Sequence, residues 1–476
     1  MTNDSNPYKS TLETAFQRAN EFLDSLDLGP VGVTSSYKQL KTLWDWDLQA
    51  HATPPEQVIN ELCQAALPGL NLNQSGRFFA WVIGGSHPSA IAADWLTSTW
   101  DQNAGLYACT PSSSIVEEIA GHWLKQILHL PLDASFAFVT GCQMAHFTCL
   151  GAARNYLFHL QGWDVEAKGM QGAPPIRIIC GDQKHSTVPR ALRMLGFGTD
   201  SIIQVPSDAE GRIRPDAFEA EMKRQPEVPA LVLLQAGDIH TGAFDDFQSL
   251  IPVAHTYPSW VHIDGAFGLW AAASKGYSHL LKGADQADSW ATDGHKWLNV
   301  PYDSGFAFTA HPDAHSRAFA VRAGYLPQES EMRDQMTWTP EFSRRARGYA
   351  TFAAIRELGT DGIQDLVDRL CLHARGIVDG ISPHPQVEVL AYPIINQGVI
   401  RFLSSAEKGG DQLHDQCTVD VIDAINASGE AFFQPSVYKG MKCMRISVSG
   451  WRTNEEDVAR AVKAIHQAIR EVNTKT

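Results

Sequence analysis

Between residues 136 and 308 the chain alternates short apolar runs with longer segments of helical pattern. Short strand-like runs separated by helices predict an α/β protein with a largely parallel, helix-covered sheet. Seven runs occur, so we predict seven strands. They are Phe136 to Val139, Ile176 to Cys180, Ile202 to Val205, Leu231 to Leu234, Trp260 to Asp264, Ser289 to Thr292 and Phe306 to Phe308.

The pattern differs on both sides of this region. Two helical segments, near Lys9 to Leu26 and Pro54 to Ala66, flank a polar stretch around Gly29 to Ser36. After about Gly359 the pattern predicts a helix, two strands, a helix, a strand and a closing helix from Glu455. These three strands are Val387 to Leu390, Val399 to Leu403 and Met444 to Val448. We therefore expect an N-terminal helical arm (1–100), a large domain (101–358) and a smaller C-terminal α+β domain (359–476).

Composition limits the binding partners and the cellular compartment that we expect for this protein. The chain has 476 residues, with 53 acidic against 38 basic side chains and a net charge of -15, which argues against nucleic acid or an anionic membrane as main partner. The amino terminus lacks a signal-peptide pattern, and no apolar run approaches the length of a membrane span. The eight cysteines show neither Cys-x-x-Cys nor metal-ligand spacing. We expect reduced thiols, no metal and a cytoplasmic protein.

Two residues suggest the chemistry. Asp264 ends one apolar run, and Lys296 follows the next. A lysine amine can hold an aldehyde as a Schiff base, and a carboxylate can keep a pyridine nitrogen protonated. The pair therefore points to pyridoxal phosphate as cofactor.

The neighbours of both residues resemble a known family. Asp264-Gly265-Ala266 and His295-Lys296-Trp297, the latter after an Asp-x-x-x-x-Asp-Gly run, resemble signatures of group II pyridoxal-phosphate-dependent decarboxylases. This family includes aromatic amino acid and glutamate decarboxylases. The resemblance extends from about Arg77 to about Arg452. It also includes Arg77 to Trp81, Gly181 to Ser186, Thr241 to Asp245 and Ser343 to Arg345. It implies a fold type I pyridoxal-phosphate-dependent transferase, and a homodimer whose arm wraps the partner.

Cofactor-binding residues follow from this resemblance. It implies that His185 stacks on the pyridine ring, that Ala266 covers the opposite face, and that His295 reaches the phosphate. The stretch Gly141, Cys142 and Gln143 follows a strand and opens a helical run from Met144 to Leu160. Amides at a helix start suit a phosphate. Many family members have Gly-Gly-Ser/Thr-Glu at this place, so side-chain contacts differ here.

On the substrate side, Arg445 resembles an arginine that binds the substrate carboxylate in aminotransferases of this fold, and Arg345 is the alternative. Tyr325 resembles the loop tyrosine that protonates the product carbon in aromatic decarboxylases. Phe79 and Trp81, with Phe78 and Tyr325, suggest a pocket that tolerates aromatic substrates. Trp290 and Trp297 are expected to serve packing.

One departure from the family adds a further candidate. The family commonly has Gly-Thr-Thr before Thr-Gly-Ala-Phe-Asp, whereas this chain has Gln235 to His240 there. Asp238 within it could recognise the substrate amino group or alter the cofactor's phenolic oxygen.

The expected function is decarboxylation of an amino acid to a primary amine and carbon dioxide, through a Schiff base on Lys296. Lys296 or Tyr325 would return the proton. Three alternatives stay open: an aminotransferase, an oxidative decarboxylase that forms an aldehyde, and a noncatalytic protein that binds pyridoxal phosphate. The substrate is an amino acid whose identity the sequence leaves open.

Overall fold

The large sheet has seven strands, as the sequence predicts. The computed structural model describes residues 6–320, 332–405 and 410–475. The strand order is β2-β8-β7-β6-β5-β3-β4. All neighbours are parallel except β8, which is antiparallel to both β2 and β7. The bounds are β2 Ser135–Val139, β3 Arg177–Gly181, β4 Ile202–Val205, β5 Ala230–Gln235, β6 Ser259–Asp264, β7 Ser289–Asp293 and β8 Gly305–Thr309. The predicted, mostly parallel sheet is thereby confirmed.

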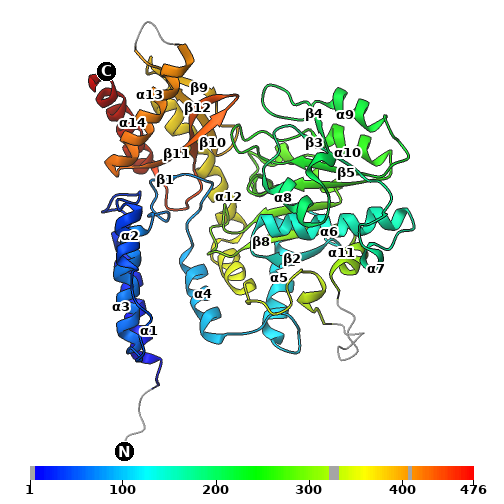
Figure 1. The fold of residues 1–476 in the computed structure, drawn as a ribbon, viewed down its shortest axis with the longest axis horizontal. Coiled ribbons are helices and arrows are strands. Elements are labelled where there is room, and N and C mark those ends of the chain that lie inside the picture. The colour runs from blue at the N-terminus through cyan, green and yellow to red at the C-terminus, as the bar shows by residue number, and fades with distance from the viewer. Residues whose placement is uncertain (1–5, 321–331, 406–409, 476) are drawn as a thin grey trace, which may run out of the picture.

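Helices cover both faces of this sheet, because its strands are apolar on both sides. In β5, Leu231 and Leu233 face a cluster with α6 (Cys142–Leu160) and α8 (Thr187–Met194). Val232 and Leu234 face the opposite cluster, which contains residues of α5 (Pro111–Ile127), α9 (Pro215–Met222) and α10 (Phe247–His255). Figure 1 shows this region at the right, in green and cyan. The arrangement leaves the carboxyl ends of the parallel strands free to form a site.

The smaller sheet has five strands in the order β1-β11-β12-β10-β9. Their bounds are β1 Phe78–Phe79, β9 Val387–Ala391, β10 Gln397–Phe402, β11 Phe432–Tyr438 and β12 Met441–Ser447. Helices α13 (Gly410–Ser428) and α14 (Glu455–Lys475) complete this part. The pattern did not predict β11, because Pro435 and polar residues interrupt its apolar run. Nor did it predict β1, which pairs with β11 in parallel although some 350 residues separate them.

One long helix connects the two sheets. Helix α12 (Gly348–Ile381) is kinked at Gly359, whose φ of 61° and ψ of -175° are accessible to glycine and strained for other residues. The change of pattern near Gly359 thus marks a bend within a helix. The domain boundaries at residues 100 and 358 stay predictions.

The N-terminal arm contains α1 (Lys9–Ser25), α2 (Tyr37–Leu43) and α3 (Pro55–Ala66), followed by α4 (Pro88–Trp100). Figure 1 shows α1 and α3 side by side, standing apart from the large sheet. Helix α2 was not predicted. It begins with a capping box in which Ser36 and Gln39 satisfy each other's backbone amides. No described helix combines the length and apolarity that crossing a membrane requires.

Candidate active site at the carboxyl ends of the strands

A pocket of about 260 Å³ lies where the parallel strands β3, β5, β6 and β7 end. Asp264 is the last residue of β6, and Lys296 follows β7 by three residues. Both line this pocket, together with His185 and Ala266. Four residues selected from the sequence therefore share one cavity, at the edge where open α/β sheets bind ligands.

Lys296 forms an ion pair inside this site. Its Nζ lies 3.0 Å from Oδ2 of Asp293, the last residue of β7. Burial alone would lower the pKa of the Lys296 amine, but the charge of Asp293 and its hydrogen bond raise it above the usual value. The amine is therefore held as an ammonium by a carboxylate that the sequence analysis did not select.

Asp264 is buried, and both of its carboxylate oxygens have partners. Oδ1 accepts a hydrogen bond from the Ala266 amide at 3.1 Å, and Oδ2 lies 3.5 Å from Nε2 of His146. Burial alone would raise the pKa of Asp264. Its interaction with His146, together with the nearby His185 and Lys296, holds that pKa well below its usual range. Asp264 is thus an anion at neutral pH, as a partner for a protonated ring nitrogen must be.

His185 contributes a polar ring to the pocket lining, and Ala266 contributes an apolar methyl group. His185 follows β3, and its Nδ1 lies 2.8 Å from Oγ1 of Thr187, which fixes the ring. Burial lowers the pKa of His185, against the attraction of Asp264. Their predicted positions on the two faces of a cofactor ring stay predictions.

The start of α6 is shaped for close approach. A Cβ on Gly305 would lie 2.4 Å from the Cα of Gly141, so the backbone at Gly305 can approach Gly141 only because it lacks a side chain. The Cys142 amide donates to Oδ1 of Asp293 at 2.5 Å, and Nε2 of His295 lies 3.3 Å from the same oxygen. Two groups predicted to hold the phosphate thus already meet an anion. This fits their predicted preference for negative charge.

Gln143 supplies a second sign of a ligand at this place. Both polar atoms of its side-chain amide are buried and have no hydrogen-bond partner among the described residues. Buried amides without partners are rare in proteins. Four features are together compatible with pyridoxal phosphate. They are the Lys296 amine, the ionised Asp264, the start of α6, whose Cys142 amide donates to a carboxylate, and the unpaired Gln143 amide.

Arg445 and Asp238 do not line the pocket. Arg445, on β12, is buried and donates to Oε1 of Gln434 at 2.8 Å, while its Nε has no partner among the described residues. Burial lowers the pKa of Arg445 to about 10. Oδ1 of Asp238 accepts from the amides of His240 and Thr241 at 2.8 and 2.7 Å, so its clear contacts are to a turn.

The remaining substrate candidates do not meet at the pocket. Phe79 is fully buried and stacks on Phe433. Trp81 is 41% exposed and packs near Phe78. Arg345 donates to Asp94 and Ser98 of α4. Tyr325 lies outside the described residues. Trp290 and Trp297 are buried in the hydrophobic core, in line with the packing role expected of them.

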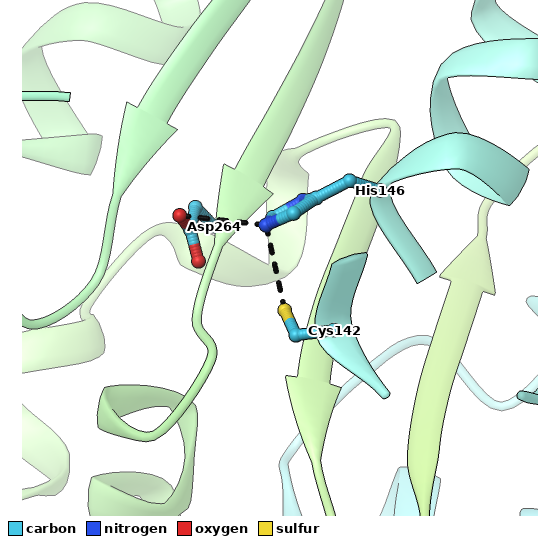
Figure 2. A group of neighbouring side chains, drawn as sticks. All are labelled: Cys142, His146 and Asp264. Carbon is cyan, nitrogen blue, oxygen red and sulfur yellow. Dashed lines mark hydrogen bonds and ion pairs between the residues drawn. The ribbon is translucent and has the colours of Figure 1, made fainter. Parts of the chain in front are cut away.

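Sequence reasoning missed two histidines beside Asp264. His146 is four residues after Cys142 on α6, and Figure 2 shows its ring between Cys142 and Asp264. His262 lies two residues before Asp264 on β6 and contacts His146. A spacing of four on a helix and of two on a strand places residues on the same face, which is the signal that could have found them.

Cys142, His146 and Asp264 are also residue types that bind metals, and their donor atoms lie within 4.8 Å of one another. A hydrogen bond joins Cys142 to His146, and an ion-pair contact joins His146 to Asp264. Burial raises the pKa of the Cys142 thiol well above its usual value, so the thiol is protonated and a poor ligand.

Comparison with solved structures shows which known fold the chain shares. The fold is similar to the crystal structure of Oryza sativa TDC with PLP and tryptamine, with a TM-score of 0.90 and 22% identity, over 100% of this chain and 99% of that one. It is also similar to mouse CSAD, with a TM-score of 0.89 and 20% identity, over 98% and 99%. The predicted fold class is confirmed.

The chain belongs to the pyridoxal-dependent decarboxylase family, whose conserved-domain model matches residues 38–403. It is 23% identical to aromatic-L-amino-acid decarboxylase of Bacillus atrophaeus, over 95% of this chain and 93% of that protein. It is 24% identical to 4-hydroxyphenylacetaldehyde synthase of Rhodiola rosea, over 89% and 86%, and 25% identical to L-2,4-diaminobutyrate decarboxylase of Rhizobium meliloti (strain 1021), over 81% and 76%. The predictions of family, cofactor and pyridoxal-phosphate-dependent decarboxylation are confirmed.

Proposed function

We propose that Lys296 carries pyridoxal phosphate, that Asp264 faces its ring nitrogen, and that His185 and Ala266 cover its two faces. The observation that carries this proposal is the shared pocket of these four residues. The start of α6 and His295 would receive the phosphate, supported by their contacts to an anionic oxygen. When bound, the cofactor supplies an electron sink for the bond cleaved at Cα.

The protein's own groups then have separate tasks. Asp264 keeps a negative charge beside the ring nitrogen, supported by its lowered pKa. Lys296, whose pKa is raised by Asp293, is an ammonium at neutral pH and can deliver a proton to Cα. Arg445 is the candidate for the substrate carboxylate, because its buried Nε lacks a partner and guanidinium geometry suits a carboxylate.

We propose an aromatic amino acid as substrate and the corresponding amine as product. Support comes from the relative in Bacillus atrophaeus, which is named for aromatic amino acids and is matched along nearly its whole length. The pocket also contains apolar surface from Ile239 and Phe267. Aromatic side chains gain most from such surface.

The test is a panel of the standard amino acids and diamino acids with the holoenzyme, measuring carbon dioxide, amine, aldehyde and peroxide for each. We expect stoichiometric carbon dioxide and amine from an aromatic acid, and neither from the Lys296→Ala variant. Release from diamino or acidic substrates alone would overturn the substrate proposal. Formation of the corresponding keto acid with no carbon dioxide would overturn amine formation in favour of transamination.

A second outcome is oxidative decarboxylation, supported by the similarity to 4-hydroxyphenylacetaldehyde synthase. There the amino acid, oxygen and water would give the aldehyde, carbon dioxide, ammonia and hydrogen peroxide. The same panel separates the two reactions, because only the oxidative one consumes oxygen and releases peroxide.

We further propose a cytoplasmic homodimer. The arm exposes many large apolar side chains, which a monomer seldom leaves in water. They include Leu12, Phe16, Leu28, Trp44, Trp46, Val58 and Leu62. All eight cysteines are unpaired, in line with a reducing compartment. Light scattering on the full chain should give twice the monomer mass of 52.3 kDa; a monomer at micromolar concentration would contradict the dimer.

A further inference from the structure

A continuous chain of buried polar side chains lies behind Asp264, and the proposed roles do not use it. His146 Nε2 lies 3.5 Å from Asp264 Oδ2, and His146 Nδ1 lies 2.9 Å from Nε2 of His262. Nδ1 of His262 lies 2.9 Å from Oγ of Ser289, which accepts a hydrogen bond from the Trp260 indole at 2.8 Å. His146, His262, Ser289 and Trp260 are all fully buried.

The two ends of this chain are compatible with one direction of donation, toward Asp264. An ionised carboxylate only accepts, so His146 must present an N–H at Nε2 to Asp264. The Nδ1 of a neutral His146 then accepts from Nε2 of His262, whose Nδ1 accepts from the Ser289 hydroxyl. At the far end the Trp260 indole can only donate, and Ser289 receives its hydrogen bond. Each of the four side chains has a hydrogen-bond partner when each one donates to its neighbour on the side of Asp264.

The surroundings favour this neutral arrangement of His262. Burial, and then the neighbouring His146, lower the pKa of His262 well below its usual value, so that ring carries a single proton. With one N–H, it can either donate toward His146 or toward Ser289. Only donation toward His146 leaves a neutral His146 with its proton on the nitrogen beside the carboxylate.

We propose that His146 is a positioning residue that, held by His262, Ser289 and Trp260, donates a fixed N–H to Asp264 and so orients and ionises the carboxylate. This inference rests on the proposed placement of the ring nitrogen at Asp264. The Ala266 amide fixes one carboxylate oxygen and His146 the other, which defines the carboxylate plane. Polar groups organised in advance cost no rearrangement when charge is needed, which is why such support matters for catalysis.

The test uses holoenzyme reconstituted with pyridoxal phosphate labelled with nitrogen-15 in the ring, whose chemical shift reports protonation of that nitrogen. We expect His146→Phe to move the signal toward the unprotonated position and to lower kcat at least tenfold, with KM changed much less. His146→Gln restores a side-chain N–H and should recover part of both. His315→Phe removes an equally buried histidine elsewhere and should leave the nitrogen signal unchanged.

Two further variants keep the proposal testable. Ser289→Ala removes only the hydroxyl that donates to His262, and should shift the signal in the same direction as His146→Phe even if the latter fails to fold. Asp264→Asn tests the placement of the ring. A shift in Asp264→Asn with none in His146→Phe, His146→Gln or Ser289→Ala would overturn the relay alone. No shift in Asp264→Asn would show that the proposed ring placement itself is wrong.

Discussion

The Nζ of Lys296 lies 3.0 Å from the carboxylate of Asp293, the residue that ends the preceding strand. The other oxygen of Asp293 accepts the Cys142 amide at the start of α6. One carboxylate thus connects the reactive amine to the helix start proposed for the phosphate. It stabilises the ammonium form of Lys296, whereas attack on an aldehyde requires the neutral amine.

Asp293→Asn should therefore speed attachment of the cofactor. Asparagine can still accept the Cys142 amide but no longer holds the charge of Lys296, so the pKa of the amine falls. Each unit of that decrease gives about tenfold more neutral amine at pH 7. Stopped-flow absorbance after mixing apoenzyme with pyridoxal phosphate measures the rate. Asp182→Asn, which removes another acid lining the same pocket, is the control; equal rates in the two variants would contradict the prediction.

Substitutions of Arg445 and of Arg345 should have different effects on binding of the substrate carboxylate. Arg445→Met should raise KM by about 10- to 100-fold, the value of one charged hydrogen bond, with a smaller effect on kcat. Arg345→Met should leave KM within about twofold, because that side chain is already engaged with Asp94 and Ser98. Steady-state kinetics of carbon dioxide release decide between them, and a reversed order would assign the carboxylate to Arg345.

Two neighbouring glycines should differ sharply. A Cβ on Gly84 would lie 2.3 Å from the carbonyl oxygen of Lys296, whereas one on Gly85 would meet Trp451 at an ordinary 3.4 Å. Gly84→Ala should destabilise the fold by about 1–3 kcal/mol and reduce cofactor occupancy, because the backbone of the reactive lysine must move. Gly85→Ala should leave both nearly unchanged. Thermal melts and bound-cofactor absorbance give the two readouts, and equal behaviour of the variants would argue against a tight approach at Gly84.

Acid should weaken the fold partly through His315. Burial, and then the charge of Arg333, lower the pKa of His315 to about 3. Between pH 6.5 and about 3 the unfolded chain binds this proton and the folded chain does not, so stability falls as pH falls. The expected slope is about 1.4 kcal/mol per pH unit for one such group.

His315→Gln keeps a donor for the Trp338 carbonyl and an acceptor for Ser135, but it removes the proton-binding site. The variant should lose less stability than the wild type between pH 6.5 and 5, by about 1.6 kcal/mol. Denaturant unfolding at both pH values measures this. His255→Gln provides a contrast of opposite sign in a separate series above pH 6.5, because the Asp288 hydrogen bond raises the pKa of His255 and its contribution is lost as pH rises. Parallel pH profiles for His315→Gln and wild type would contradict the assignment.

The fold was predictable where local pattern determines it. Runs such as Leu231 to Leu234 are apolar on both faces and lie between helical segments, so their place in a parallel sheet follows from sequence. The pairing of Phe78–Phe79 with β11 depends on contacts across the whole chain, and no local signal carries it.

The candidate site was likewise predictable where local sequence determines it, and not where it depends on contacts between distant residues. Lys296 and Asp264 were selected because the chemistry requires their residue types next to strand ends. Asp293 was part of a quoted motif, yet its contact with Lys296 depends on the turn after β7. His146 became visible only once α6 lay against β6, since its partner Asp264 is more than a hundred residues away.

The pairing of β1 with β11 has a consequence for how the chain can be divided. Residues 359–476 contain four of the five strands of the small sheet, and the missing one comes from residues 78–79. Expressed alone, this segment would present the backbone of β11 as an open edge, with Phe432 and Phe433 deprived of the rings of Phe78 and Phe79 that stack on them. Open, apolar edges recruit other strands. We therefore expect that residues 359–476 need residues 78–79 in order to fold as a unit.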